Sequence, residues 1–308
     1  CRADCLYCGI RRSNGTVHRY TLSKDEVLAA ARHCAEAGYG SLTLQAGERR
    51  DAAFIDYVCR LLERIKTETR GPALPEGLGI TLSVGEQSPE TYRRFLEAGA
   101  HRYLLRIETS SPELFARIHP PGQRYADRRA ALRAVRDAGF QVGTGVMIGL
   151  PGQTVRDLAA DIRFFAVEGV DMIGMGPYLP HASTPMGSGR RVSDDERALL
   201  LDRTLRMIAL TRLVLRDVNI AATTALQTLD ALGRERALQG GANVVMPVVT
   251  PVSVRSGYQL YDGKACVDED RTMCAGCISG RVAWTGRPVE ANRWGDAPHF
   301  ARRKNDRE

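Results

Sequence analysis

The sequence predicts a (β/α)₈ barrel of the TIM type with a C-terminal extension. Its 308 residues suit such a barrel, which typically takes about 250 residues. From residue 41 onward, short apolar runs alternate with helical patterns, which is typical of repeated β/α units. No Pro-, Gly- or Ser-rich linker divides the chain. We therefore expect one barrel over residues 1–250, with an extension over 251–308 packed on it.

Seven strands are predicted by the apolar runs. They are expected at residues 41–48, 78–86, 102–109, 141–149, 172–180, 219–227 and 244–250. The chain opens at Cys1 without a methionine. We therefore expect the first strand of the barrel to precede this cysteine and to be missing from the chain.

Helix signals fill the gaps between these strands. Ser23 and Glu26 have the spacing of a capping box. Further start and stop signals are the Ser-Pro pairs at 88–89 and 111–112 and the glycines at 99, 139 and 169. Cys34 and Cys59 fall on the apolar stripes of the first two helices, so we expect both to be structural.

Composition narrows the class of protein. The sequence has no run of about 18 apolar residues, so no membrane span is expected. A net charge of +7 would suit an anionic partner, but the basic residues are scattered and no RNA-binding module is appended. Six of the eight cysteines fall into two groups of three, which suits metal sites in a reducing cytoplasm better than disulfides. We expect a cytoplasmic protein with a small-molecule substrate and no nucleic-acid partner.

The first cysteine group carries the strongest chemical signal. Cys1, Cys5 and Cys8 have the spacing C-x₃-C-x₂-C, with Tyr7 before the last cysteine. Three thiolates on one loop suit a 4Fe–4S cube, which usually takes four cysteines. One iron is then left open for chemistry, as in catalytic zinc sites. A zinc site that recruits a distant fourth ligand is the alternative.

Active sites of such barrels lie at the carboxyl ends of the strands, and the residues expected there are mostly polar. They are Gln45, Gly47, Glu48, Thr81, Ser83, Arg106, Glu108, Met147, Met172, Thr223 and Thr224. The spacing of two places Arg106 and Glu108 on one face of a strand. If that face lines the lumen, the two ions must either bind a ligand or pair with each other.

The cysteine loop resembles the radical S-adenosylmethionine (SAM) superfamily, whose signature is C-x₃-C-x-aromatic-C. Across nearly the whole chain the sequence resembles, more narrowly, the HydE family of FeFe-hydrogenase maturases. The segments that carry this resemblance are CRADCLYCGIRRSN, LTLQAGE, HRYLLRIET, GVMIGLPGQT, GMGPYLPH, NIAATTAL and YQLYDGKAC. It implies an enzyme that cleaves SAM at a 4Fe–4S cluster and helps to assemble the hydrogenase active site. Its partners would be sister maturation proteins and an electron donor.

The resemblance also implies roles for individual residues. Cys1, Cys5 and Cys8 would be the cluster ligands, and the Tyr7 backbone and Met147 would lie near adenine. Gly47 and Glu48 would hold the SAM amino group, while Glu108 and Arg128 would contact its ribose and carboxylate. Residues around the substrate cavity would be Gln45, Thr81, Arg106, Met172, Thr223, Thr224 and Tyr261. The implied substrate is an iron–carbonyl–cyanide complex of cysteine, whose sulfur the radical attacks.

Two positions depart from the family pattern. Ile107 stands where a histidine is expected, and Val248 and Val249 replace a more polar, aromatic pair. A paralogue with another small substrate, such as a methylornithine synthase-like mutase, therefore stays open. A biotin synthase-like sulfur insertion would need cysteines on the barrel strands, and the predicted strands carry none.

The second cysteine group matches an auxiliary cluster that only some members of the family keep. It comprises Cys266, Cys274 and Cys277. We expect a possible second iron–sulfur cluster here without a catalytic role, and zinc or idle thiols are the alternatives.

Overall fold

A computed structural model describes residues 1–266 and 271–305, except for the side chains of 271–275. Seven parallel strands form one sheet in the order β1-β2-β3-β4-β6-β5, with β7 also paired to β6. They are β1 (Ser41–Gln45), β2 (Gly79–Ser83), β3 (Arg102–Leu104), β4 (Gln141–Thr144), β5 (Met147–Ile148), β6 (Met172–Pro177) and β7 (Asn219–Ala222). With its alternating helices, the sheet forms a half-barrel of the TIM type, as the sequence predicted.

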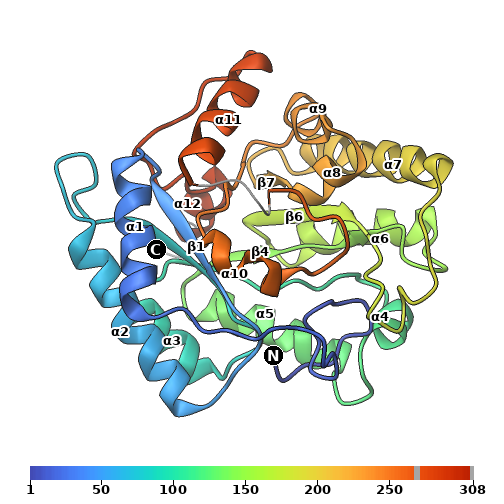
Figure 1. The fold of residues 1–308 in the computed structure, drawn as a ribbon, viewed down its shortest axis with the longest axis horizontal. Coiled ribbons are helices and arrows are strands. Elements are labelled where there is room, and N and C mark those ends of the chain that lie inside the picture. Colours follow the sequence, from blue (N-terminus) through green and yellow to red (C-terminus); the bar gives the residue numbers. More distant parts are fainter. Residues whose placement is uncertain (267–270, 306–308) are drawn as a thin grey trace.

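Helices cover the outer side of this curved sheet (Figure 1). Those up to β7 are α1 (Lys24–Glu36), α2 (Ala52–Glu68), α3 (Pro89–Glu97), α4 (Pro112–Ile118), α5 (Tyr125–Asp137), α6 (Val155–Val167) and α7 (Asp194–Val214). The helices that follow β7 in the chain are α8 (Thr224–Leu229), α9 (Gly233–Gln239), α10 (Val252–Arg255), the short 3₁₀ helix η1 (Ser256–Tyr258), α11 (Arg271–Trp284) and α12 (Pro298–Asn305). Of these, α12 lies at the amino ends of the strands and not on the outer side of the sheet. Within the described ranges, no helix combines the length and apolar character needed to span a membrane.

The predicted helix signals are confirmed. Ser23 and Glu26 exchange the two hydrogen bonds of a capping box at the start of α1. Ser88 and Ser111 cap α3 and α4, each followed by a proline. The glycines at 99, 139 and 169 all adopt positive φ after a helix. Cys34 is buried in the core, and Cys59 is half-buried against it.

Two strand predictions were wrong at their C-terminal ends. β7 stops at Ala222, and Thr224 begins α8, although the run of β-branched threonines resembles a strand. In residues 244–250, only Val244 pairs with the sheet, through a single bridge to Ala221. Pro247 and Pro251 flank the valine pair there, and proline cannot donate a ladder hydrogen bond.

The predicted strands at 102–109 and 141–149 are interrupted. β3 ends at Leu104 and rejoins the sheet only through a bridge between Glu108 and Val146. The second run is divided into β4 and β5. The buried Thr144 side chain explains the break in the first run, because its hydroxyl donates to the Leu105 carbonyl and accepts from the Ile107 amide in place of a backbone partner.

A C-terminal segment closes the amino ends of the strands. We call residues 293–303 the C-terminal seal. Its Asp296 carboxylate accepts hydrogen bonds from Arg102 at the start of β3 and Gln141 at the start of β4, at 2.9 and 2.7 Å. Its His299 and Arg303 bind the fully buried Asp171 carboxylate just before β6, both at 2.7 Å. With the amino ends sealed, the carboxyl ends are left for a ligand.

Candidate active site

The cysteine loop lies across the carboxyl ends of the strands. The Arg2 amide donates to the Glu48 carbonyl beyond β1 at 2.9 Å, and the Leu6 amide donates to the Ile118 carbonyl at the end of α4, also at 2.9 Å. The Gly9 amide donates to the Leu260 carbonyl at 3.0 Å. Three distant parts of the chain therefore fix the loop at the open end of the half-barrel.

The three thiols of this loop fit an iron–sulfur cluster. All are free, and burial raises the pKa of Cys5 to about 11 and that of Cys8 to about 12. Cys5 and Cys8 are neutral thiols on their own, so a bound cation would be needed to ionise them. Within the described residues, no three Cys, His, Asp or Glu side chains are close enough to hold one metal ion. An iron–sulfur cube would take one thiolate on each of three irons, which suits three thiols on one loop.

Glycine at position 47 lets the loop approach β1 closely. A Cβ added to Gly47 would lie 2.7 Å from the Cys1 Cβ, well inside van der Waals contact. The neighbouring Glu48 amide donates to the Cys1 sulfur at 3.3 Å. Gly47 and Glu48, which the sequence singled out, therefore both contact the first cysteine.

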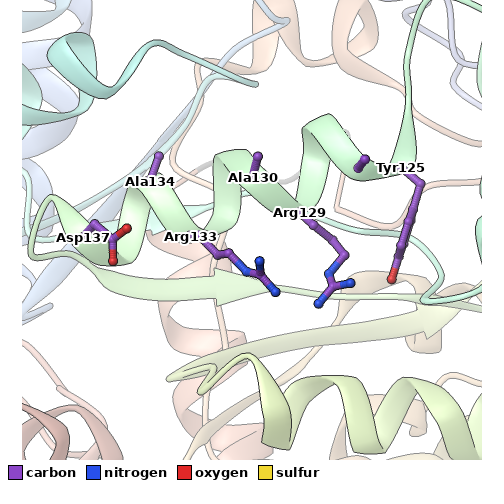
Figure 2. A pocket seen from close by; sticks show the side chains of 7 residues that line it. Tyr125, Arg129, Ala130, Arg133, Ala134 and Asp137 are labelled. Atoms are coloured by element: carbon purple, nitrogen blue, oxygen red, sulfur yellow. The ribbon is translucent and has the colours of Figure 1, made fainter.

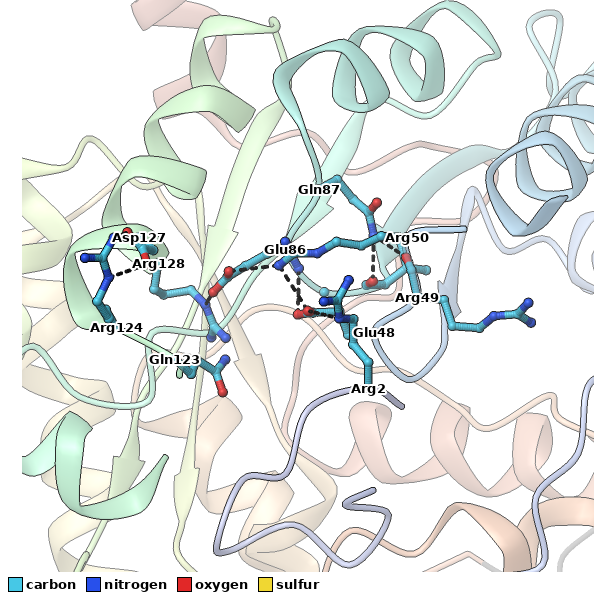
Figure 3. A network of polar contacts seen from close by, with 12 residues as sticks. Arg2, Glu48, Arg49, Arg50, Glu86, Gln87, Gln123, Arg124, Asp127 and Arg128 are labelled. Atoms are coloured by element: carbon cyan, nitrogen blue, oxygen red, sulfur yellow. Dashed lines mark hydrogen bonds and ion pairs between the residues drawn. The ribbon is translucent and has the colours of Figure 1, made fainter. Parts of the chain in front are cut away.

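An alternating chain of charges runs beside the loop (Figure 3). Arg50 bridges the carboxylates of Glu48 and Glu86, at 3.1 Å to each. Arg128, which is buried, binds the other oxygen of Glu86 at 2.6 Å. Arg2 lies 4.0 Å from Glu48 at the rim. The sequence predicted Glu48 and Arg128, but it missed Arg50 and Glu86, although Glu86 ends a predicted strand.

Arg106 and Glu108 form a two-pronged ion pair. The Arg106 Nε and Nη2 donate to the two Glu108 oxygens at 2.8 and 2.9 Å. Arg106 also donates to the Gly174 and Val146 carbonyls at 2.5 and 3.0 Å. Burial opposes the charge on Arg106, but Glu108 outweighs it and raises the Arg106 pKa. Of the two alternatives that the sequence left open, internal pairing is the one present here.

Close packing at two glycines makes room for this arginine. A Cβ at Gly145 would lie 2.7 Å from the Arg106 Nη1, and one at Gly174 would lie 3.2 Å from it. A Cβ at 145 would also overlap the Gly174 carbonyl oxygen, so any larger residue there would clash with the β6 backbone as well as with the guanidinium. Gly174 on β6 and Gly145 between β4 and β5 thus leave the space that the Arg106 side chain occupies.

The substrate-cavity candidates divide into three groups. Thr224 and Tyr261 are brought together, with 3.1 Å between their hydroxyls, while the Thr223 hydroxyl donates to the Met175 carbonyl at 3.2 Å. Met172 lies against Gly143, since a Cβ there would be 2.6 Å from the Met172 Cε. Thr81, which is buried on β2, and Gln45, which is exposed at the end of β1, lie on adjacent strands.

Tyr7 and Met147 pack in one small apolar cluster with Met186, Ile118, Leu150 and Tyr178. The Tyr7 hydroxyl lies 3.5 Å from the Nε2 of His119. The Nδ1 of His119 must carry its proton, because it lies 2.9 Å from the Phe115 carbonyl, which can only accept. Burial lowers the His119 pKa to about 3, so this ring stays neutral and Nε2 accepts from Tyr7. His119 was not predicted, because no motif in the sequence includes it.

The second cysteine group is described only in part. Cys266 adopts a φ of 63°, and its carbonyl accepts from Arg255 at 3.1 Å. Cys277 is exposed on α11, and the Cys274 side chain lies outside the described residues. A second cluster held by these three cysteines therefore stays a prediction.

A groove of about 400 Å³ runs along the outer face of α5 (Figure 2). Its residues include Tyr125, Arg129 and Arg133, and both arginines bind the Glu168 carboxylate. The groove therefore lies on the helical exterior, and the candidate active site at the strand ends is separate from it.

Known proteins share both the sequence and the fold. The radical SAM superfamily model matches residues 1–165. The FeFe hydrogenase maturase subunit HydE of Thermotoga maritima is 40% identical over 288 residues, which cover 93% of this chain and 78% of that protein. The 3-methylornithine synthase of Methanosarcina acetivorans is 26% identical, covering 85% of this chain and 70% of that protein. A crystal structure of methylornithine synthase has a TM-score of 0.75 at 25% identity, covering 94% of this chain and 80% of that one.

Proposed function

This chain belongs to the radical SAM superfamily and, within it, to the family of the HydE maturase, and from that premise we propose that it matures the FeFe-hydrogenase active site. It is a radical SAM enzyme, of a superfamily that uses a 4Fe–4S cluster and SAM. When bound, the cluster would supply the electron that cleaves the SAM sulfonium to a 5′-deoxyadenosyl radical. The observation that carries the proposal is the set of three free thiols beside Glu48 at the open end of the half-barrel.

The charged chain supplies complementary partners for the amino-acid part of SAM. Cys1, Cys5 and Cys8 would hold the cluster. Glu48 lies directly beside Cys1 and would accept hydrogen bonds from the SAM amino group. The charge of Arg128 lowers the pKa of Cys5, against the effect of burial, so Arg128 lies near the cysteine loop. Arg128 would bind the SAM carboxylate. Arg50, which now bridges two carboxylates, would give up one of them as SAM enters.

The adenosine part would lie on the other side of the loop. Met147 and the Tyr7 backbone would contact adenine, because Met147 packs with Tyr7 in one apolar cluster. Glu108 would bind the ribose hydroxyls. Glu108 is also the ion-pair partner of Arg106. One residue of this pair would therefore bind SAM and the other would bind the substrate.

The substrate would be an iron–carbonyl–cyanide complex of cysteine held in the lumen. Arg106 offers a cation, and Thr223, Thr224 and Tyr261 offer hydroxyls, which suit carboxylate or cyanide groups. The other lining residues would be Gln45, Thr81 and Met172. Sister maturation proteins and an electron donor would be its partners. The thiols of Cys1, Cys5, Cys8 and Cys59 are free, which supports a cytoplasmic location.

The test is anaerobic reconstitution followed by two assays. The protein with dithionite and SAM should release 5′-deoxyadenosine, and it should consume the synthetic iron–cysteine complex while doing so. The rival substrate class is an amino acid, because a 3-methylornithine synthase covers most of this chain at 26% identity. Formation of 3-methylornithine from its isomer lysine, with the iron complex left untouched, would overturn the maturase proposal.

A further inference from the structure

The segment from Leu105 to Ser110 leaves the regular sheet at the centre of the site. β3 ends at Leu104, and Glu108 adopts a φ of 65°. A non-glycine residue in this left-handed region is strained, and such strain persists only when the surroundings enforce it. The backbone contributes two hydrogen bonds at this point: the Glu108 amide donates to the Gly145 carbonyl, and its carbonyl accepts from the Met147 amide, both at 2.9 Å.

Two buried side chains hold the segment on either side of Glu108. Thr144 binds the part before it, since its hydroxyl donates to the Leu105 carbonyl at 2.8 Å and accepts from the Ile107 amide at 3.0 Å. Asp161 binds the part after it, because its Oδ1 accepts from the Ser110 amide at 2.6 Å. Both side chains are fully buried.

Asp161 is an unusual residue for the middle of a helix that packs on the core. Its Oδ2 and the nearby Ser110 hydroxyl are buried, and neither has a hydrogen-bond partner among the described residues. Burial raises the Asp161 pKa to about 6 and outweighs the hydrogen bond that the Ser110 amide donates to the carboxylate. The ionisable groups that face it are Asp157 on the same helix and Tyr125 on α5. An apolar residue would cost less here, so the carboxyl has a role in holding Ser110.

We propose that Asp161 and Thr144 are positioning residues that hold Glu108 in its strained conformation, aimed at Arg106 and the SAM ribose. They act through the backbone of residues 105–110 and touch neither ligand. The SAM part of this inference rests on the proposed function. The backbone part stands without it, because the two hydrogen-bonded segments are present in the protein alone.

The amino end of the same sheet provides a matched control. Asp171 is equally buried, and its Oδ2 accepts from the Val142 amide at 2.8 Å, which is the same kind of bond that Asp161 makes. Asp171 lies at the sealed end, so Asp171→Asn should disturb stability without disturbing Glu108. For the threonine, the control is Thr204→Val, since Thr204 is buried and bonds only within α7, to the Leu200 carbonyl at 2.7 Å.

The experiment compares Asp161→Ala, Asp161→Asn and Thr144→Val with these two controls in the reconstituted protein. Equilibrium dialysis measures the Kd for SAM. The rate of amide hydrogen exchange measures how readily residues 105–111 open. Asp161→Ala should weaken SAM binding about tenfold and speed amide exchange in that segment. Thr144→Val should do both to a smaller degree. Asp161→Asn should restore both, because its amide oxygen can accept from the Ser110 amide while its NH₂ donates to the Ser110 hydroxyl.

Three results would overturn the inference: unchanged exchange of residues 105–111 in both Asp161→Ala and Thr144→Val, an unchanged Kd for SAM in both, or an equal weakening of SAM binding in Asp171→Asn. If Asp161→Ala does not fold, Thr144→Val decides. If the wild-type protein binds no SAM, the proposed function fails, and the exchange data alone decide whether these two side chains hold the segment.

Discussion

The two ends of the parallel sheet hold their buried charges in different ways. At the amino end, Asp171 has a backbone amide, His299 and Arg303 as partners, and Asp296 has His101, Arg102 and Gln141. At the carboxyl end, the carboxylates share their partners. Arg50 forms ion pairs with both Glu48 and Glu86. The partner of Arg106 is Glu108, whose backbone is strained.

This difference indicates which end is built for stability and which for binding. At the amino end, hydrogen bonds join the C-terminal seal to five strands or the residues just before them. Within residues 293–303 the positive φ falls on a glycine, Gly295, which adopts it without strain. The carboxyl end has the strained Glu108 at its centre, paired with Arg106. Proteins tolerate such features where a ligand completes the site.

The largest expected effect on stability comes from the amino end. Asp171→Asn leaves Arg303 and His299 without their carboxylate, and breaking a buried pair in this way costs about 3–5 kcal/mol. Denaturant unfolding should show this loss, while the Kd for SAM should stay within a factor of about two. Weakened SAM binding in a folded Asp171→Asn protein would mean that the two ends are not separate in function.

The matching change at the carboxyl end should affect binding first. Glu48→Gln removes the charge proposed to meet the SAM amino group, and a lost charge-assisted hydrogen bond is worth about 1.5–3 kcal/mol, or roughly one to two decades in affinity. Its stability should change less than that of Asp171→Asn, because Arg50 keeps Glu86 as a partner. Isothermal titration with SAM, beside denaturant unfolding, measures both quantities. Normal SAM affinity in Glu48→Gln would contradict the assigned role.

The pH dependence of folding stability should differ in sign between the two ends of the sheet. Burial opposes ionisation of Asp296, but hydrogen bonds from His101, Arg102 and Gln141 outweigh it and lower the Asp296 pKa well below its usual range. Burial also lowers the His101 pKa. Both shifts give stability that is lost as the pH falls, because the unfolded state then binds more protons than the folded state. Asp296→Asn should therefore flatten the acid side of the stability profile.

The contribution of Asp161 to folding stability should change with pH in the opposite direction. Its pKa is raised to about 6, so between about pH 4 and 6 the folded state binds the extra proton, and this carboxyl lowers stability as the pH rises. Asp161→Asn should thus gain stability relative to wild type on going from about pH 4 to 7. Asp296→Asn should lose stability relative to wild type on going from about pH 2 to 4, because there Asp296 binds a proton in the unfolded chain but not in the folded protein. Unfolding midpoints from about pH 2 to 7, measured for both variants, would show the comparison to be wrong if the two changes had the same sign.

The smallest expected effect concerns the second cysteine group. Replacing Cys266, Cys274 and Cys277 together by Ser should lower the iron content by up to about four atoms per chain if a second cube is present. SAM cleavage should stay intact, because the proposed SAM contacts lie on the first cysteine loop and its neighbours. Iron analysis and 5′-deoxyadenosine release provide the two readouts. Lost cleavage in a folded triple variant would assign this group an essential role.

Features within one loop or strand end were predictable from the sequence. The cysteine spacing, the capping box of Ser23 and Glu26, and the Arg106–Glu108 pair depend on residues only a few positions apart. Arg50 and Glu86 were missed as a bridge because their contact depends on two loops meeting in space. Asp161 and Ser110 are separated by 51 positions for the same reason. The β-branched residues at 223–224 and 248–249 indicated strands, but a helix start and nearby prolines decided the structure there.

Reductive cleavage of SAM in the Cys5→Ala variant tests the central claim most directly. The control is Cys59→Ala, since Cys59 is a half-buried thiol on α2, outside the cysteine loop. After anaerobic reconstitution, the wild type and Cys59→Ala should release 5′-deoxyadenosine with dithionite, and Cys5→Ala should release none above background while losing the iron of the first cluster. Undiminished 5′-deoxyadenosine release by a folded Cys5→Ala protein would contradict a cluster held by Cys1, Cys5 and Cys8.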